Sequence, residues 1–416
     1  MRPDPMKLTQ RILAATGMFL ILGIVSARAD ITPIAGWDNQ LFPSYLIATA
    51  ALKHEPQEES GDTLGDADGQ LGVILVATED DQAVTVSIQC DEFLETSEFR
   101  GNLPTAGETY VIYPKIRYRF DRLGKCRQAT PATVTYRVRM GSEDSEELSK
   151  TVTFRSINDC PLQVRTESDV VDTKFAFAAY VNEQHPFVDK LLREALDLGI
   201  VDKFDGYQSG NPQDVVRQVY ALWDLLAARD VRYSSITTTV ADSVMVPSQH
   251  VRMLEETANN SQANCVDGSV LLVSLLRKIG IHAALVLEPG HCFVAFSADA
   301  EGKIALGLET TLIAAELETP EEIDELLDES VDENVRNETS WSSFVAAVNV
   351  GTSALVKNDD QLKSGRDDNY AFIDIRTWRA KGVLPIPFHG EESLVSFEFS
   401  SSDEETDADE DDEDAE

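Results

Sequence analysis

The chain has 416 residues, and its 73 aspartates and glutamates outnumber its 35 lysines and arginines, for a formal net charge of -38 at pH 7. A surface of that sign repels phosphate backbones and anionic lipid headgroups, which argues against nucleic acid or an acidic membrane surface as a partner. The apolar fraction of 43% is ordinary for a globular protein, and the length suits two or three domains.

The N-terminus has the pattern of an export signal. A basic stretch that includes Lys7 precedes an apolar run over residues 12–26, and Ala27-Arg28-Ala29 then fits the small-x-small cleavage rule. The run is shorter than the ~20 residues that span a bilayer. We therefore expect a signal peptide over 1–29, cleaved after Ala29, and a periplasmic or secreted protein without stable membrane insertion. An uncleaved anchor is the alternative.

Short apolar segments separated by turn residues follow an acidic stretch over 55–69. Val84, Val86 and Ile88 alternate with polar residues, which is the period of a half-buried strand. Strands are predicted over 71–78, 83–89, 109–120, 133–140 and 148–155. Their close spacing favours an all-β, immunoglobulin-like sandwich over 30–165.

The five cysteines are odd in number, which in an exported protein implies at least one free or intermolecular thiol. Cys90, Cys126 and Cys160 fall in the predicted sandwich, and three cysteines allow one disulfide and leave one thiol over. The pair stays open. Since there is no CxxC motif and there are only six histidines, a structural zinc site is not expected.

Beyond Pro161 the apolar pattern becomes helical. One helix is predicted over 187–196, and a second over 214–229 after Asn211-Pro212, a good N-cap and first-turn pair. Trp223 lies on the apolar face of the second helix and is interpreted as a core residue. His185 and His250 fall in polar loops and are expected to be solvated.

Cys265 stands at the start of a third predicted helix. Asn264 is a suitable N-cap, and Leu271, Leu272 and Leu275 share the apolar face that follows. In the first turn, unpaired amide N–H groups and the helix dipole stabilise a thiolate, the reactive form of cysteine. Cys265 is therefore the candidate nucleophile.

Three strands are predicted after this helix, over 281–287, 291–296 and 304–309. An antiparallel hairpin with its loop centred on Ala300 places Phe296 opposite Ile304 and His291 opposite Glu309. A carboxylate there would orient the imidazole and stabilise its protonated form. Strand alternation sends Cys292 to the opposite face, where we expect it to be buried and unreactive.

This order, a Cys at a helix start, a His on a strand and an acid on the next, resembles the transglutaminase-like superfamily. The resemblance is carried by Cys265-x-Asp267-Gly268 and by Gly290-His291-Cys292-Phe293-Val294. It is closest to a bacterial exported group with three further motifs. These are Gln249-x-x-Arg252, Leu308-Glu309-Thr310-Thr311 and a late stretch over 372–376.

The resemblance covers about residues 170–390 and implies a papain-like, transglutaminase-like α+β domain over 166–390. It assigns Cys265 as nucleophile, His291 as general base and acid, and Glu309 as the acid that orients His291. Gln249 becomes a candidate for the oxyanion hole or for substrate binding. The chain departs from the group twice: Glu309 stands where Asp is commoner, and Cys292 where a small residue is usual. No metal or organic cofactor is implied.

The sequence thus predicts an exported, thiol-dependent amide-bond enzyme, a peptidase or amidase or else a transamidase, acting on a polypeptide or peptide-like amide. The alternative is a catalytically retired transglutaminase-like domain that acts as a binding or assembly protein. Separately, a disulfide from Cys265 to Cys160 or another sandwich cysteine would leave the site inactive. The acidic tail over 391–416 is expected to be disordered. The oligomeric state is left open.

Overall fold

A computed structural model describes residues 31–53, 61–66, 68–166, 169–235, 243–320, 322–365, 367–390 and 392–396. The chain is a mixed α+β protein with 32% helix and 29% strand in several sheets. The predicted signal peptide and nearly all of the predicted tail lie outside these residues. Within the described part, no helix is long and apolar enough to cross a membrane.

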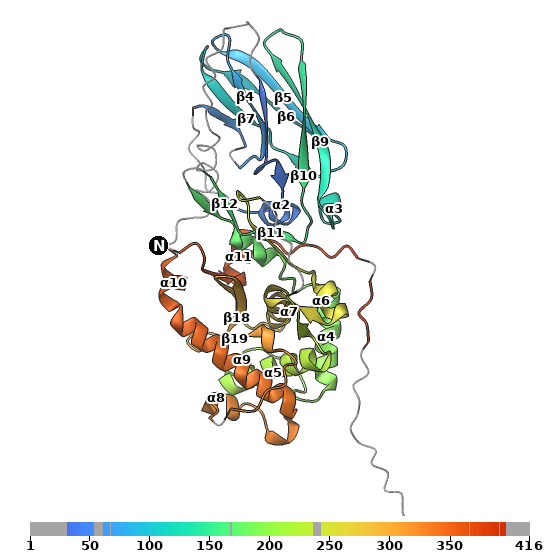
Figure 1. Cartoon of the computed structure of the whole chain (residues 1–416), viewed down its shortest axis with the longest axis vertical. Coiled ribbons are helices and arrows are strands. Elements are labelled where there is room, and N and C mark those ends of the chain that lie inside the picture. Colours follow the sequence, from blue (N-terminus) through green and yellow to red (C-terminus); the bar gives the residue numbers. More distant parts are fainter. Residues whose placement is uncertain are drawn as a thin grey trace, which may run out of the picture.

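Two β-sheets make up the N-terminal half, at the top of Figure 1. The four-stranded sheet has the order β1-β4-β7-β3, and the curled six-stranded sheet has the order β2-β10-β9-β5-β6-β8. The strands are β1 (Thr32–Ala35), β2 (Gln40–Leu41), β3 (Thr63–Gly65), β4 (Leu71–Val76), β5 (Gln82–Cys90), β6 (Leu94–Leu103), β7 (Thr109–Tyr113), β8 (Arg117–Tyr118), β9 (Thr130–Met140) and β10 (Glu146–Phe154).

The apolar alternation predicted for this half is confirmed in β5 and β9, whose buried residues occur at every second position. Buried side chains from both sheets, such as Val73 and Val86, belong to one hydrophobic core. The single strand predicted over 109–120 was wrong. It is divided into β7, β8 and a short helix, α3 (Phe120–Leu123), and β6 had no prediction at all.

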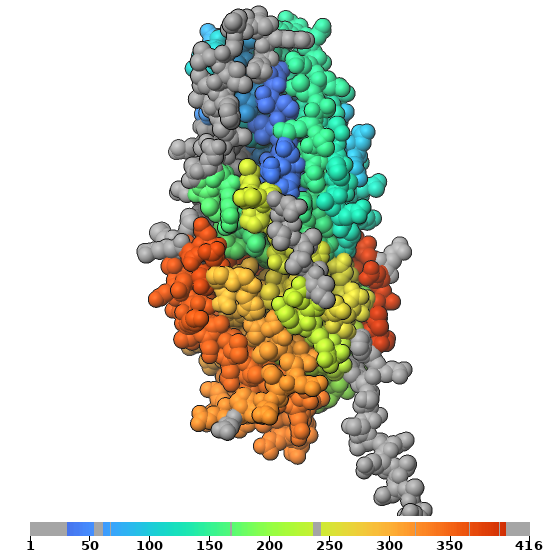
Figure 2. Space-filling model, in the orientation of Figure 1, coloured from blue at the N-terminus to red at the C-terminus, as the bar shows by residue number. Residues whose placement is uncertain are grey.

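Short elements connect the two halves, which are stacked along the long axis of the molecule (Figure 2). Strand β11 (Asp159–Pro161) pairs antiparallel with β15 (Ser248–His250), so segments about ninety residues apart share a two-stranded sheet. The helix α2 (Pro43–Thr49) is almost wholly buried here and packs against β11 and the 3-10 helix η2 (Lys174–Ala179). A second small ladder joins β12 (Gln163–Arg165) to β13 (Val170–Asp172).

The C-terminal half is built on an antiparallel sheet of order β19-β18-β17-β20. Its strands are β17 (Ala283–Glu288), β18 (His291–Ser297), β19 (Ala305–Leu308) and β20 (Ala371–Asp374). The helix α7 (Cys265–Lys278) packs on one face, against β17 and β18. The helices α9 (Glu338–Lys357) and α10 (Asp359–Ser364) cover the other face, where Val286 and Phe293 form a second apolar cluster with Leu362.

The remaining elements surround this sheet. They are α4 (Pro186–Asp197), α5 (Pro212–Ala228), β14 (Arg232–Tyr233), α6 (Leu254–Asn260), β16 (Gln262–Ala263), η3 (Thr310–Leu312), α8 (Glu325–Asp328), η4 (Glu333–Val335) and α11 (Ile375–Lys381). The predicted N-cap Asn211 and the predicted core position of Trp223 in α5 are both confirmed.

The strand β19 and the helix α9 meet backbone to backbone at two glycines. A Cβ atom on Gly307 would lie 2.1 Å from the carbonyl carbon of Gly351, a distance that no side chain tolerates. Just beyond this contact, the amide of Glu309 donates to the carbonyl of Ala347 at 3.0 Å. The close approach of α9 therefore determines where Glu309 lies.

Candidate active site

Asn264 caps the helix that begins with Cys265, as the sequence predicts. Its Oδ1 accepts from the amides of Val266 at 2.8 Å and Asp267 at 2.9 Å, and its carbonyl accepts from the amide of Gly268 at 3.1 Å. Among the described residues, the amide of Cys265 is then the one first-turn donor without a partner. The nucleophile candidate is thus half-buried at the positive end of α7.

His291 and Glu309 lie in direct contact. The Nε2 atom of His291 is 2.6 Å from Oε2 of Glu309. The predicted register was nevertheless wrong by two residues, because Phe296 pairs with Leu306 rather than Ile304. A shift of two keeps every side chain on its face of the sheet. Glu309 follows the end of β19 and reaches His291 diagonally, which is within range for long side chains.

The opposite charges of His291 and Glu309 stabilise each other. Hydrogen bonding to Cys265, and then to Glu309, raises the pKa of His291 to about 10. Burial alone would raise the pKa of Glu309, but hydrogen bonds from His291 and Thr311 outweigh it and hold that pKa below its usual value. With Nε2 directed at Glu309, the other ring nitrogen, Nδ1, is the one available to the Cys265 thiol.

The residues after Glu309 connect it to α7, the helix that begins with Cys265. Oε1 of Glu309 accepts from the amide of Thr311 at 3.1 Å and from its hydroxyl at 2.5 Å. The Thr310 hydroxyl lies 3.1 Å from that of Ser269, which itself donates to the carbonyl of Cys265 at 2.7 Å. Sequence reasoning gave neither threonine a role, although the Leu-Glu-Thr-Thr motif contained both.

Asp267 and Arg252, which belong to two separate motifs, form one buried ion pair. Oδ1 of Asp267 accepts from the Arg252 amide at 2.8 Å, and Oδ2 accepts from Nη1 of Arg252 at 2.7 Å and from the Asn264 amide at 3.0 Å. Burial is the largest influence on Asp267 and leaves its pKa raised despite these bonds. The pair therefore connects the segment that follows β15 to the first turn of α7.

Cys292 is buried, as predicted from strand alternation. It is 1% exposed and belongs to the same core as Val294 and Phe296, whereas Phe293 faces the α9 side. Burial raises the pKa of its thiol well above the usual value, which disfavours the nucleophilic thiolate. Cys292 therefore has none of the properties of a rival nucleophile.

All five cysteines are free thiols. Cys265 is half-buried, and Cys90, Cys126, Cys160 and Cys292 are buried. The disulfide between Cys265 and Cys160 or another sandwich cysteine is therefore contradicted, and so is the disulfide expected between two of Cys90, Cys126 and Cys160.

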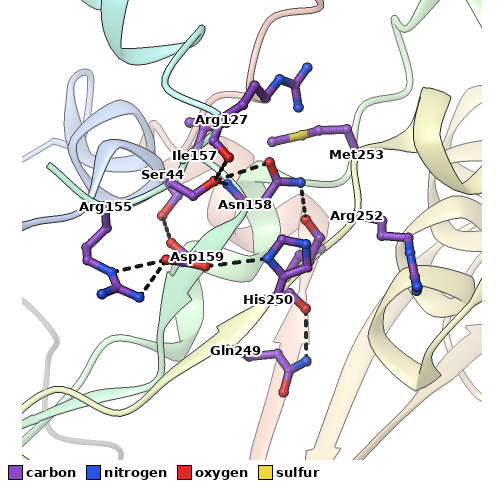
Figure 3. A network of polar contacts seen from close by, with 12 residues as sticks. Ser44, Arg127, Arg155, Ile157, Asn158, Asp159, Gln249, His250, Arg252 and Met253 are labelled. Atoms are coloured by element: carbon purple, nitrogen blue, oxygen red, sulfur yellow. Dashed lines mark hydrogen bonds and ion pairs between the residues drawn. The ribbon is translucent and has the colours of Figure 1, made fainter. Parts of the chain in front are cut away.

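Gln249 lies on β15, and its Nε2 donates to the carbonyl of His250 at 2.9 Å (Figure 3). Its assignment to the oxyanion hole stays a prediction. The solvated position expected for His185 was wrong: the residue is 3% exposed, and its Nδ1 accepts from the amide of Phe187 at the start of α4. Its Nε2 lies 3.2 Å from Glu255, so a carboxylate compensates the buried imidazole.

Within the described ranges, no three His, Cys, Asp or Glu side chains are grouped so as to hold a metal ion. Comparison with protein-family models and with curated proteins found no match to this chain.

Proposed function

We propose that this protein is an exported, thiol-dependent amide-bond enzyme in which Cys265 is the nucleophile, His291 the general base and acid, and Glu309 the acid that orients His291. The observation that carries the proposal is the position of His291, which interacts with the Cys265 thiol and lies 2.6 Å from Glu309. The protonated imidazole stabilises a thiolate, and the carboxylate stabilises the imidazolium.

The chemistry follows from these positions. The Cys265 thiolate attacks the amide carbonyl, so an S–C bond forms while the carbonyl oxygen becomes an oxyanion. The free amide of Cys265 is suited to donate to that oxyanion. Collapse breaks the C–N bond, and the imidazolium of His291 protonates the departing amine. The neutral imidazole then takes a proton from water as the water oxygen attacks the thioester carbonyl. The C–S bond breaks, the sulfur leaves as the Cys265 thiolate, and a carboxylic acid is released, which restores the thiolate–imidazolium ion pair.

The architecture supports the transglutaminase-like assignment. A Cys-bearing helix packed on an antiparallel sheet that carries the His is the papain-like arrangement, here α7 against β17 and β18. The two N-terminal sheets with a shared core support an immunoglobulin-like sandwich over 30–165 that presents a substrate to the 166–390 domain. We propose hydrolysis of a polypeptide or peptide-like amide in the periplasm or outside the cell. An amine in place of water would make the enzyme a transamidase.

The second candidate is a catalytically retired domain that binds or assembles. The free thiol of Cys265 and its contact with the partly buried His–Glu pair favour the enzyme, because a retired site has no need to retain an ionised dyad.

Thiol labelling decides between the two. The mature protein is treated with limiting iodoacetamide at pH 6 to 7, and alkylation of each cysteine is followed by peptide mapping. The enzyme assignment requires Cys265 to react at least about ten times faster than an unstructured cysteine peptide, as expected for a thiolate. If Cys265 is no faster than that peptide in the folded protein, the retired-domain alternative holds. A screen of peptide and cell-wall amides with wild type and Cys265→Ala then identifies the substrate.

A further inference from the structure

Arg252 belongs to a segment, residues 248–253, that the N-terminal half of the molecule holds in place. Asn158 Nδ2 donates to the carbonyl of Val251 at 2.8 Å, and the amide of Val251 donates back to the Asn158 carbonyl at 2.7 Å. One residue on, Asp159 pairs with His250 across the β11–β15 ladder. Figure 3 shows the side chains of Asn158 and Asp159 directed at this segment. The backbone next to Arg252 is therefore held in place by Asn158 and Asp159.

On its other side, Arg252 contacts the first turn of α7, the helix that begins with Cys265. Its guanidinium and its amide both bind Asp267, two residues after Cys265, and the two side chains are 13% and 0% exposed. Asp267 also accepts from the amide of Asn264, so it completes the capping box of α7. The helix thus depends on Asp267 for its geometry.

The position of Asp267 also destabilises a negative charge on Cys265. A buried carboxylate in the first turn opposes a thiolate two residues away, because like charges in a desolvated site destabilise each other. In the described part of the chain, the His291 imidazolium beside Cys265 is paired with the Glu309 carboxylate, so these two charges compensate each other. The nearby Cys292 thiol adds no charge, because burial raises its pKa well above the usual value. Arg252 is the cation in contact with Asp267, so it is the group that removes the net negative charge from this end of α7.

We propose that Arg252 is a positioning residue of the active site: by binding Asp267 it completes the cap of α7 without leaving a net negative charge beside the Cys265 thiolate. This inference depends on the proposed function, since it concerns the reactivity of the same thiol. It assigns a purpose to the Gln249-x-x-Arg252 motif, and it makes the N-terminal half, through Asn158, a structural part of the site.

The test is the pH profile of Cys265 alkylation by iodoacetamide, measured on the full-length mature protein with peptide mapping. The readout is the pH at which the rate reaches half its maximum. Arg252→Gln leaves Asp267 uncompensated and should raise this midpoint by about one pH unit, the size of a nearby charge effect. Asp267→Asn leaves the guanidinium uncompensated and should lower it. Arg252→Gln with Asp267→Asn, and Arg252→Lys alone, should return it to the wild-type value.

A purely structural clamp would change accessibility, and with it the maximal rate, but would leave all midpoints equal. Equal midpoints in folded variants therefore overturn the inference. Should Arg252→Gln fail to fold, as breaking a buried ion pair often causes, Asp267→Asn remains decisive: an unchanged or raised midpoint refutes the inference. Arg193→Gln is the matched control, because Arg193 forms an exposed pair with Asp197. If wild-type Cys265 itself has the midpoint of a free cysteine, the proposed function fails instead.

Discussion

Replacing Glu309 with Gln tests the core of the proposed mechanism. The substitution keeps the shape of the side chain and removes its charge. The wild-type contact is a charge-assisted hydrogen bond of 2.6 Å between Oε2 and Nε2 of His291, in a site where the Glu309 side chain is 8% exposed. Such bonds contribute about 1.5–3 kcal/mol. Because the carboxylate stabilises the imidazolium that in turn stabilises the thiolate, the loss should reduce Cys265 reactivity by roughly 10- to 150-fold at neutral pH.

The assay is the iodoacetamide rate at Cys265, measured at pH 7 and again at pH 10, where a thiolate no longer needs its partners. Wild type and Glu309→Gln should differ strongly at pH 7 and converge at pH 10. The matched control is Glu318→Gln, the same change in charge at an exposed position. If folded Glu309→Gln reacts within about threefold of wild type at pH 7, well below a 10-fold loss, Glu309 does not stabilise the ion pair and the triad is refuted.

Three further predictions concern the cysteines, the pH dependence of stability and the packing under β19. Cys265→Ala should abolish amidase or transamidase activity, whereas Cys292→Ala should keep most of it and most of the Cys265 labelling; activity lost from Cys292→Ala alone in a stable protein would contradict the assignment. Because the folded pKa of His291, about 10, lies above the ordinary value of 6.5, its contribution to stability is complete below pH 6.5 and lost as the pH rises toward 10. The Tm difference between wild type and His291→Gln should therefore shrink from pH 6.5 to pH 10. A Tm difference that grows over this range would contradict the raised pKa of His291. Gly307→Ala should lower the free energy of unfolding in urea by about 1–3 kcal/mol or more, since its Cβ meets backbone that has no room to move; Gly61→Ala, with no atom within 4 Å of its Cβ, should be nearly neutral.

Local patterns account for most of what could be predicted. The period-two strands β5 and β9, the Asn211-Pro212 start of α5 and the Asn264 cap of α7 are all encoded within a few residues, and each is confirmed. The strand β6 escaped prediction because Leu94, Ser97 and Leu103 are its only buried residues, so the sequence has no apolar period.

At the candidate site, too, the sequence determined some features and the tertiary structure determined the others. The sequence by itself determined which residues have the right chemistry, and it determined that His291 and Glu309 share a face, since a register error of two does not change the face. Only the tertiary structure decided the register, because the contact of Gly307 with Gly351 depends on a helix more than forty residues away. It likewise decided that Arg252 meets Asp267: a charged pair fifteen residues apart has no local signature, and only the folding of the 248–253 segment against Asn158 brings them together.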